Sequence, residues 1–364
     1  MQKAKQLLTI LCFAAVIYGF FAAMLVKEDA ALSFSERRKL QQFPTLQGEA
    51  LWNGEFTEDL ELYLQDQFPA RDTMRRVKAV TAFDVLRRRD NNGIYLQNGS
   101  MYKLEYPLHE GQVLLAAQKL NDLYDTYLSG MPVYYAVIPD KNYFAAAQND
   151  YPSMDYAAMK ELLRTHISSA EEIELFDCLT AEDYYRTDPH WRQDRLDRVT
   201  ARLGSAMSVS LPPLSAYETN SFAPFYGAYL GQSALAAEPD EIRYLTSSIT
   251  QTAELYTYET DHISSLYTPE AYDGMDGYDL FLSGASAFQI ITNPQNDSGR
   301  ELLIFRDSFG SSLAPLLLPG YSKITLIDLR YMSSELLPSL LTFGDQDVLF
   351  LYSTLVWNNG AMLR

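Results

Sequence analysis

A run of twenty residues without a charged side chain, Leu7–Val26, most constrains how this 364-residue chain can fold. As an α-helix the run would be roughly 30 Å long, which matches the hydrocarbon core of a bilayer. Lys3 and Lys5 precede it, and a large acidic remainder follows. We therefore expect residues 1–27 to form a single-pass cell-membrane anchor, with the rest of the chain extracytoplasmic. A cleaved signal peptide, processed within residues 22–31, is the alternative.

Charge and cysteine content exclude several classes of function. The net charge of −18 repels nucleic-acid phosphates, so we exclude nucleic acid as a partner. Cys12 lies in the apolar run and Cys178 far along the chain, so a disulfide between them is not expected. The sequence contains no CxxC motif and no Cys/His ligand cluster, so nothing in it predicts a zinc site or another cofactor.

Residues 28–92 have the pattern of a stalk followed by a helical lead-in. The first part is polar and irregular (SFSERRKLQQFP), and the second mixes aliphatic, aromatic and charged positions at helical spacing. It carries two basic runs, Arg75-Arg76 and Arg87-Arg88-Arg89. The Asn91-Asn92-Gly93 cluster then predicts a turn, which we take as the boundary of the next domain.

From residue 93 to residue 364 the pattern predicts alternating strands and helices. Short, nearly continuous apolar runs predict buried strands over 133–138, 173–176, 302–305, 324–327 and 348–352. Apolar positions at helical spacing predict helices over 113–128, 156–167, 192–207, 309–317 and 333–342. This alternation predicts an α/β domain with a parallel sheet covered by helices on both faces.

Three polar segments follow predicted strands. They are Pro139-Asp140-Lys141, Asp188-Pro189-His190 and Asp307-Ser308. Ligands of parallel sheets bind beyond the carboxyl ends of the strands. We therefore expect these segments to converge at one edge of the sheet.

His190 stands in the segment RTDPHW, whereas the other histidines (His109, His166 and His262) are assigned structural roles. Pro189 favours an extended conformation for Asp188, and residues two apart in extended chain project to the same side. The carboxylate could then reach Nδ1–H of the imidazole and leave Nε2 as a general base. Asp188 as a helix N-cap, with Pro189 at the first helical position, is an equally good interpretation.

Ser308 lies in LLIFRDSFGSS, at a predicted strand-to-helix turn where its hydroxyl can be exposed. Helix capping by Asp307 or Ser308 is the alternative. No histidine follows Ser308, which excludes the α/β-hydrolase order. An Asp only two residues before its His also differs from the chymotrypsin and subtilisin arrangements. The spacing instead suggests the SGNH hydrolase arrangement in permuted order.

Six segments in this order resemble the DHHW family, which is related to the SGNH-like O-acetyltransferases of alginate and other exopolysaccharides. They are SFSERRKLQQFP, GEFTEDLELYLQDQFPARD, IPDKNYF, TDPHW, LLIFRDSFGSSLAPLL and ITLIDLRY. The resemblance covers residues 33–356 and implies an SGNH-like fold. Two departures stand out: DHHW has become DPHW, and Arg306 replaces a glycine of the nucleophile motif.

The resemblance implies a catalytic triad of Ser308 as nucleophile, His190 as base and Asp188 as orienter. It also implies acetyl transfer to a polysaccharide through an acyl-serine, with a membrane O-acyltransferase supplying the acetyl group.

The oxyanion partners are less defined than the triad. The Ser308 N–H is the expected donor, and Asn293, Arg330 and Asp307 are weaker oxyanion or substrate candidates. For Lys141 we expect a neighbouring carboxylate as partner, with an acidic sugar as the alternative.

Two other functions stay open at this point. The chain could be an acetylesterase if water replaces the sugar. It could also be a non-catalytic, membrane-tethered factor for polysaccharide binding or assembly. The distance from Ser308 Oγ to His190 Nε2 discriminates, since a separation far beyond hydrogen-bond reach favours the non-catalytic factor.

Overall fold

The computed structural model describes residues 2–46, 48–272 and 274–364. These residues belong to two compact units. Unit 1 contains residues 1–92 and 230–236, and unit 2 contains residues 93–229 and 237–364. The sequence-based division into an anchor (1–27), a lead-in (28–92) and a catalytic domain (93–364) stays a prediction.

Unit 1 begins with α1 (Gln2–Val26), a helix with no buried residue. By length and hydropathy α1 could cross a membrane, and a signal sequence would meet the same description. The remaining elements of unit 1 are short: the antiparallel pair β1 (Leu32–Ser33) and β2 (Arg38–Lys39), then α2 (Gly48–Asn53), α3 (Glu55–Asp66), α4 (Arg71–Val80) and a π-helical turn Thr81–Val85.

Unit 2 is built around one large sheet with the strand order β10-β9-β11-β13-β12-β14-β5-β6. The last five strands of this order are parallel: β13 (Lys323–Ile327), β12 (Glu301–Arg306), β14 (Asp347–Ser353), β5 (Val133–Ile138) and β6 (Glu171–Glu172). The other three are antiparallel to their neighbours: β11 (Phe288–Thr292), β9 (Glu254–Thr257) and β10 (His262–Ser264). The predicted α/β class with a largely parallel sheet is confirmed.

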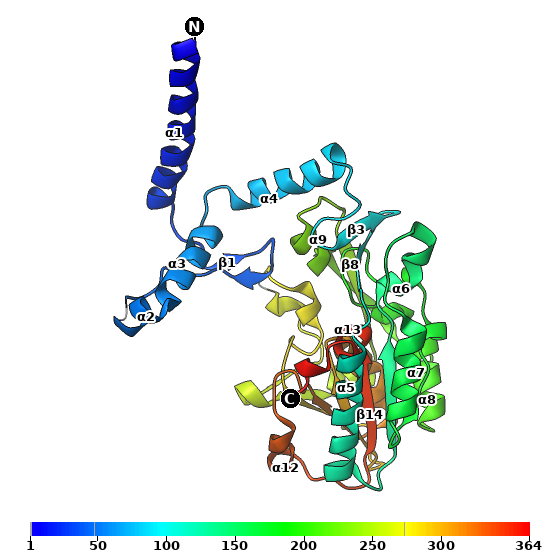
Figure 1. Ribbon diagram of the computed structural model, residues 1–364. Coiled ribbons are helices and arrows are strands. Elements are labelled where there is room, and N and C mark those ends of the chain that lie inside the picture. The colour runs from blue at the N-terminus through cyan, green and yellow to red at the C-terminus, as the bar shows by residue number, and fades with distance from the viewer. Residues whose placement is uncertain (1, 47, 273) are drawn as a thin grey trace. The chain divides into compact units, whose positions relative to one another are not determined.

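Alternate residues of the parallel strands enter two separate cores, because successive side chains of a strand point to opposite faces. In β12, Leu302 and Ile304 pack with α8 (Asp197–Ala206) and α11 (Phe309–Leu317). Their neighbours Leu303 and Phe305 pack on the other face with α5 (Glu110–Leu123), α7 (Tyr156–His166) and α13 (Thr354–Trp357). Helices therefore cover both faces, and Figure 1 shows them packed around β14.

The smaller elements of unit 2 surround the sheet. The hairpin β3–β4 and the pair β7–β8 are antiparallel. The bounds are β3 Ile94–Gln97, β4 Ser100–Lys103, α6 Lys141–Ala145, β7 Glu218–Phe225, β8 Asp240–Thr246, α10 Ser248–Thr252 and α12 Leu337–Leu340, while α9 (Ala228–Ser233) crosses between the units.

Three of the predicted elements differ from the structure. The helix expected over 333–342 is a 3-10 turn (Ser334–Leu336) followed by the short α12 (Leu337–Leu340). A strand over 173–176 is absent: pairing in this region is limited to β6, and a 3-10 turn follows over Phe176–Cys178. The alternating apolar residues Ile173 and Leu175 are buried in the core, so their pattern reports burial. The helix expected over 192–207 begins only at Asp197, after a short 3-10 turn.

Candidate active site

Three side chains from two distant segments form a continuous chain of contacts. Ser308 lies two residues beyond Arg306, the last residue of β12, at the N-cap of α11. Its Oγ lies 2.7 Å from Nε2 of His190, and Nδ1 of the same ring lies 2.6 Å from Oδ1 of Asp188. Because a carboxylate can only accept, Nδ1 carries the proton and Nε2 is free to accept from the serine hydroxyl.

The capping alternative for Asp188 is only partly realised. Oδ1 does accept from the backbone N–H of His190 at 3.1 Å, as a cap would, but no helix starts at Pro189. The second oxygen, Oδ2, accepts from the N–H of Ala228 at 2.8 Å. Asp188 is completely buried, while the His190 side chain keeps 12% of its surface exposed. The buried carboxylate of Asp188 therefore orients the imidazole of His190, and part of the imidazole remains accessible to solvent.

The backbone before Asp188 is fixed by contacts that the sequence did not predict. Asp240, at the start of β8, accepts from the N–H and the hydroxyl of Thr187 at 2.8 and 2.6 Å. Gly227 passes so close that an added Cβ would lie 2.2 Å from the carbonyl oxygen of Thr187. A glycine is needed there because only a residue without a side chain permits this approach. The loop carrying Asp188 and His190 is thus held from two sides.

Trp191 joins this loop to the helix that follows Ser308. Its indole Nε1–H donates to Oγ of Ser312 at 2.9 Å and lies 3.2 Å from the carbonyl oxygen of Phe309. Tyr278 donates to the same Ser312 hydroxyl at 2.9 Å and stacks on the His190 ring, with centroids 3.8 Å apart and planes within 8°. These contacts fix the imidazole relative to α11. Tyr278 was not found from the sequence.

Lys141 donates hydrogen bonds to the backbone of the same loop. It is 1% exposed, and its ammonium donates to the carbonyl oxygens of Tyr185 at 2.6 Å, Arg186 at 3.1 Å and Asp188 at 3.4 Å. Burial lowers the pKa of Lys141 to about 7. The hydrogen bonds of Lys141 go to these carbonyls, and the neighbouring carboxylates of Asp188 and Asp240 act on it through their charge, which opposes the lowering of its pKa. Its burial also argues against direct contact with an acidic sugar.

The two residues before Ser308 have structural contacts of their own. Asp307 is 2% exposed and accepts from the N–H groups of Phe309 at 3.1 Å and Ser353 at 2.9 Å. Arg306, 1% exposed, donates to Oε1 of Gln289 at 2.9 Å. Both side chains therefore hold the turn at the end of β12. The carboxylate of Asp307 is committed to backbone N–H groups.

Asn293 lies at the other end of the sheet from Ser308. It follows β11, which runs antiparallel to β13, so the carboxyl end of β11 meets the amino ends of the parallel strands. Its amide donates to the carbonyl oxygens of Leu318 and Tyr321 at 3.1 and 3.2 Å. The prediction of Asn293 as an oxyanion candidate is therefore wrong. It failed because β11 was not recognised in the sequence.

Arg330 lies at the expected edge, just beyond β13. Its Nε and Nη2 donate to the two carboxylate oxygens of Asp328 at 2.9 and 2.6 Å. Asp328 is completely buried, so this fork is a stable bidentate pair. These two donors of Arg330 are occupied within the fold.

The described residues, 2–46, 48–272 and 274–364, contain no group of three or more His, Cys, Asp and Glu side chains that could hold a metal ion. What the site offers is a serine, a base and an orienting carboxylate in contact. That arrangement is suited to nucleophilic acyl chemistry.

No protein-family model matches the sequence, and no curated protein matches it. Solved structures do match. A DHHW family protein from Eubacterium siraeum superposes with a TM-score of 0.62 at 20% identity, over 75% of this chain and 94% of that one. PatB1 from Bacillus cereus gives a TM-score of 0.61 at 18% identity, over 74% of this chain and 98% of that one. PatB1 with a sulfonyl adduct gives 0.57 at 17% identity, over 74% and 96%. The similarity to the DHHW family is thereby confirmed at the level of the fold.

Proposed function

We propose that this chain is an extracytoplasmic O-acyltransferase that moves an acetyl group onto a polysaccharide through an acyl-Ser308 intermediate. The observation that carries the proposal is a pair of successive contacts. Oδ1 of Asp188 lies 2.6 Å from Nδ1 of His190, and Nε2 of His190 lies 2.7 Å from Oγ of Ser308. The acetyl group and the polysaccharide come from the sequence resemblance.

In the first step His190 accepts the hydroxyl proton of Ser308 as Oγ attacks the carbonyl carbon of an acetyl donor. The tetrahedral intermediate collapses, the donor's leaving group takes the proton from His190, and acetyl-Ser308 remains. The Ser308 N–H is the expected donor to the oxyanion.

In the second step His190 takes the proton of a sugar hydroxyl, whose oxygen attacks the acetyl carbon. The Ser308–acetyl bond breaks, and Oγ recovers the proton from His190. Asp188 keeps the proton of the imidazole on Nδ1 in both steps and stabilises the imidazolium that forms. Tyr278, stacked on the ring, holds its plane.

The donor follows from location. Acetyl donors are made in the cytoplasm, whereas α1 would hold this chain in the membrane with unit 2 outside. We therefore include a membrane O-acyltransferase as the partner that passes the acetyl group outward.

Acetylation of the serine tests the proposal without knowledge of the polymer. The full-length protein in detergent is mixed with p-nitrophenyl acetate, and its mass is followed in time. We expect one acetyl group on the peptide that contains Ser308, and no adduct in Ser308→Ala. Pretreatment with a sulfonyl fluoride should block it at the same residue. Absence of the adduct together with absence of ester turnover in the wild type would contradict the proposal.

The acceptor then separates transferase from esterase. Adding de-acetylated envelope polysaccharide from the source cells should accelerate loss of acetyl-Ser308 and place acetyl groups on the polymer. Release of acetate at the same rate with and without polymer would identify an esterase. The non-catalytic alternative predicts polymer binding with no acetyl-enzyme.

A further inference from the structure

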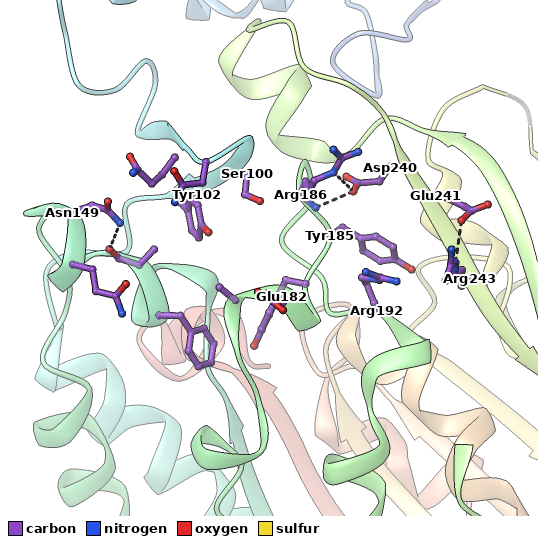
Figure 2. A pocket seen from close by; sticks show the side chains of 17 residues that line it. Ser100, Tyr102, Asn149, Glu182, Tyr185, Arg186, Arg192, Asp240, Glu241 and Arg243 are labelled. Atoms are coloured by element: carbon purple, nitrogen blue, oxygen red, sulfur yellow. Dashed lines mark hydrogen bonds and ion pairs between the residues drawn. The ribbon is translucent and has the colours of Figure 1, made fainter. Parts of the chain in front are cut away.

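A polar cavity of about 640 Å³ lies in unit 2 beside the triad loop. Its volume is within the range of ligand pockets, roughly 300–1,000 Å³. Four segments line it: the β3–β4 hairpin, α6 with the turn after it, residues 181–192, and the start of β8. Figure 2 shows their side chains around one opening. We call it the polar cavity.

The polar cavity and the triad share one loop. Tyr184 pairs with Trp191 in an isolated antiparallel bridge, and the N–H of Tyr185 donates to the carbonyl oxygen of His190 at 3.1 Å. Tyr184, Tyr185 and Arg192 line the cavity. The base of this loop thus forms cavity wall, and its tip carries Asp188 and His190. A ligand in the cavity would therefore contact the same loop that carries Asp188 and His190.

Three arginines at the polar cavity are paired with acidic side chains, and Glu182 adds one exposed carboxylate to the lining. Arg243 contacts Glu241 at 3.0 Å, and Arg186 contacts Asp240 at 3.3 Å. Arg192 contacts Asp194 at 2.8 Å. A strongly anionic or cationic ligand would meet one favourable and one repulsive partner in each pair. An uncharged ligand with many hydroxyls can instead donate to the carboxylates and accept from the guanidiniums.

One buried hydroxyl at the polar cavity lacks a partner. Tyr185 is 1% exposed, and its OH makes no hydrogen bond with any part of the chain that the structure describes. Buried hydroxyls of this kind normally find a partner. Figure 2 shows the Tyr185 ring directed to the side of the cavity where Arg192 and Arg243 lie. A hydroxyl group of a ligand placed there would complete its hydrogen bonding.

We infer that the polar cavity binds an uncharged saccharide segment of the acceptor polysaccharide, adjacent to the sugar that receives the acetyl group. The inference rests on the proposed function for the identity of the acceptor. The location, the paired charges and the Tyr185 hydroxyl supply the rest.

The test uses two measurements on full-length protein. One is hydrolysis of p-nitrophenyl acetate, which needs no polysaccharide. The other is the dependence of acetyl transfer on de-acetylated envelope polysaccharide from the source cells. Tyr185→Phe and Arg243→Ala should raise the acceptor KM about tenfold, as expected for a lost hydrogen bond, with ester hydrolysis unchanged. Tyr217→Phe is the matched control. The Tyr217 hydroxyl is also buried without a hydrogen-bond partner among the described residues, and Tyr217 does not line the cavity.

A third variant, Gln148→Trp, fills the cavity from its rim. An acceptor KM within twofold of wild type in all three cavity variants would overturn the inference. Titration of the Ser308→Ala protein with the same polysaccharide measures binding alone, so this part of the test does not depend on acetyl transfer. If wild type never forms an acetyl-serine, the proposed function fails. Weaker polysaccharide binding in the protein that also carries Tyr185→Phe would still support the saccharide site.

A separate observation concerns unit 1. Residues 71–89 carry seven basic and two acidic side chains, a net charge of +5 in a chain whose total is −18. Both basic runs, Arg75-Arg76 and Arg87-Arg88-Arg89, lie in this segment. The proposed acyl transfer does not use them. The segment covers α4 and the π-helical turn after it.

Helix α4 and the turn after it have an apolar side that the described fold leaves open. Ala79 and Ala82 are buried on the inner side. On the outer side Met74, Val77 and Val80 are 44%, 56% and 53% exposed, and Val85 and Leu86 beyond them are 69% and 60% exposed. Arg76 and Lys78 flank this apolar stripe. An exposed apolar stripe with basic flanks is typical of helices that lie in a membrane interface.

Contacts within unit 1 connect the start of α4 with the end of α1. Phe68 stacks on Phe20 of α1 with centroids 5.1 Å apart. Gln67 accepts at its carbonyl oxygen from Lys27 at 3.3 Å and at Oε1 from the N–H of Ala30 at 2.9 Å. α4 begins at Arg71, a few residues later. If α1 spans the bilayer, these contacts hold α4 at its surface.

The structure assigns α4 and the turn after it to an anionic lipid surface, with the stripe Met74–Val77–Val80 in the interface and Arg76 and Lys78 at the headgroups. Arg71 and Arg75 are instead paired with Glu36 within unit 1. This rests on α1 staying in the membrane, as in the proposed location.

Site-specific fluorescence in vesicles tests this assignment. Val77→Cys, in a Cys12→Ala background, is labelled with the environment-sensitive dye NBD. The full chain is then placed in phosphatidylcholine vesicles with or without about one third phosphatidylglycerol. We expect a blue-shifted emission that lipid-attached nitroxides quench, with more quenching in the anionic vesicles. Ile263→Cys, 56% exposed in unit 2, is the matched control and should stay water-like.

Charge reversal in Arg76→Glu with Lys78→Glu should abolish the gain from anionic lipid. Emission from position 77 as water-like as from position 263 would overturn the assignment. Shielding that appears only when a membrane O-acyltransferase is present in the vesicles would also overturn it, and would identify a protein partner instead.

Discussion

The two ends of the central sheet are both rich in buried polar side chains, yet only one of them has the geometry for chemistry. At the carboxyl ends of the parallel strands lie Asp307, Ser308 and Asp328, with Lys141 nearby. At the amino ends lie the groups around Asp347. Polarity at a strand end therefore does not identify a site by itself.

At the amino ends the polar side chains bind one another or the backbone. Asp347 accepts from Nε of Arg300 and from the hydroxyl of Tyr321, both at 2.9 Å. Arg300 also donates to the carbonyl oxygens of Ser208 and Met207 at 3.0 and 2.7 Å. This is a structural network that joins β14 to the end of α8.

At the carboxyl ends of the parallel strands most polar side chains also bind one another or the backbone, but the last group in the series of contacts differs. Asp188 holds His190, and His190 holds the hydroxyl of Ser308, which is only half-buried. The network ends in a partly exposed serine hydroxyl. We conclude that accessibility of the terminal group, rather than the number of charges, separates the candidate site from its structural counterpart.

Among the predicted effects, removal of the proposed nucleophile should change turnover most. Ser308→Ala should lower acetyl transfer at least about 10³-fold, because the acyl-enzyme cannot form. Its free energy of unfolding should change by less than about 1 kcal/mol, since Ser308 is half-buried and small. Turnover assays and urea unfolding measure the two quantities. Near-normal transfer in Ser308→Ala would show that the serine is not the nucleophile.

The second-largest loss of turnover should follow removal of the Asp188 carboxylate. Asp188→Asn should lower turnover about 10²–10⁴-fold, because an amide can donate to Nδ1 and favour the wrong imidazole tautomer. The protein should still be labelled at Ser308 by p-nitrophenyl acetate, only slowly. A turnover within threefold of wild type would mean that Asp188 serves only the backbone N–H groups of His190 and Ala228.

At the amino ends of the parallel strands, a substitution should lower stability and leave turnover nearly unchanged. Asp347→Asn should cost about 2–3 kcal/mol of the free energy of unfolding, because it breaks a largely buried pair with a partly exposed arginine. Turnover per folded molecule should stay within twofold of wild type. Chemical unfolding and active-site titration measure both. A large loss of turnover with unchanged stability would mean that the two ends of the sheet are coupled.

Much of the fold could be predicted because the central parallel strands are buried on both faces. Their apolar runs are continuous, and β5, β12, β13 and β14 were placed to within one residue at each end. The antiparallel strands β9 and β10 could not be predicted, since they are short and lie among polar loops. β11 has the sequence FQIIT, in which Gln289 interrupts the apolar run. The error at Asn293 follows directly from the missing β11.

The candidate site could be predicted from the sequence only where its residues have a characteristic spacing. Asp188 and His190 stand two residues apart, and Ser308 follows a buried strand. Tyr278 leaves no such mark, because the chain has 26 tyrosines and only the fold selects the one that stacks on the imidazole. The partners of Lys141 are backbone carbonyls, which every residue has, so no pattern of residue types reveals them.

The last prediction concerns stability alone and involves Lys141, which donates to backbone carbonyls of the loop that carries Asp188 and His190. Burial lowers its pKa from 10.5 to about 7, so between about pH 7 and 10 the unfolded chain carries more protons on this amine than the folded chain. Stability from this group therefore rises with pH through that window, by at most about 1.4 kcal/mol per pH unit. The free energy of unfolding of wild type relative to Lys141→Met should increase from pH 7 to pH 9. Urea unfolding at both pH values measures it, with Lys160→Met as the control, because Lys160 lies in a more exposed ion pair with Glu174. A difference independent of pH would mean that Lys141 has the same charge in the folded and unfolded chain.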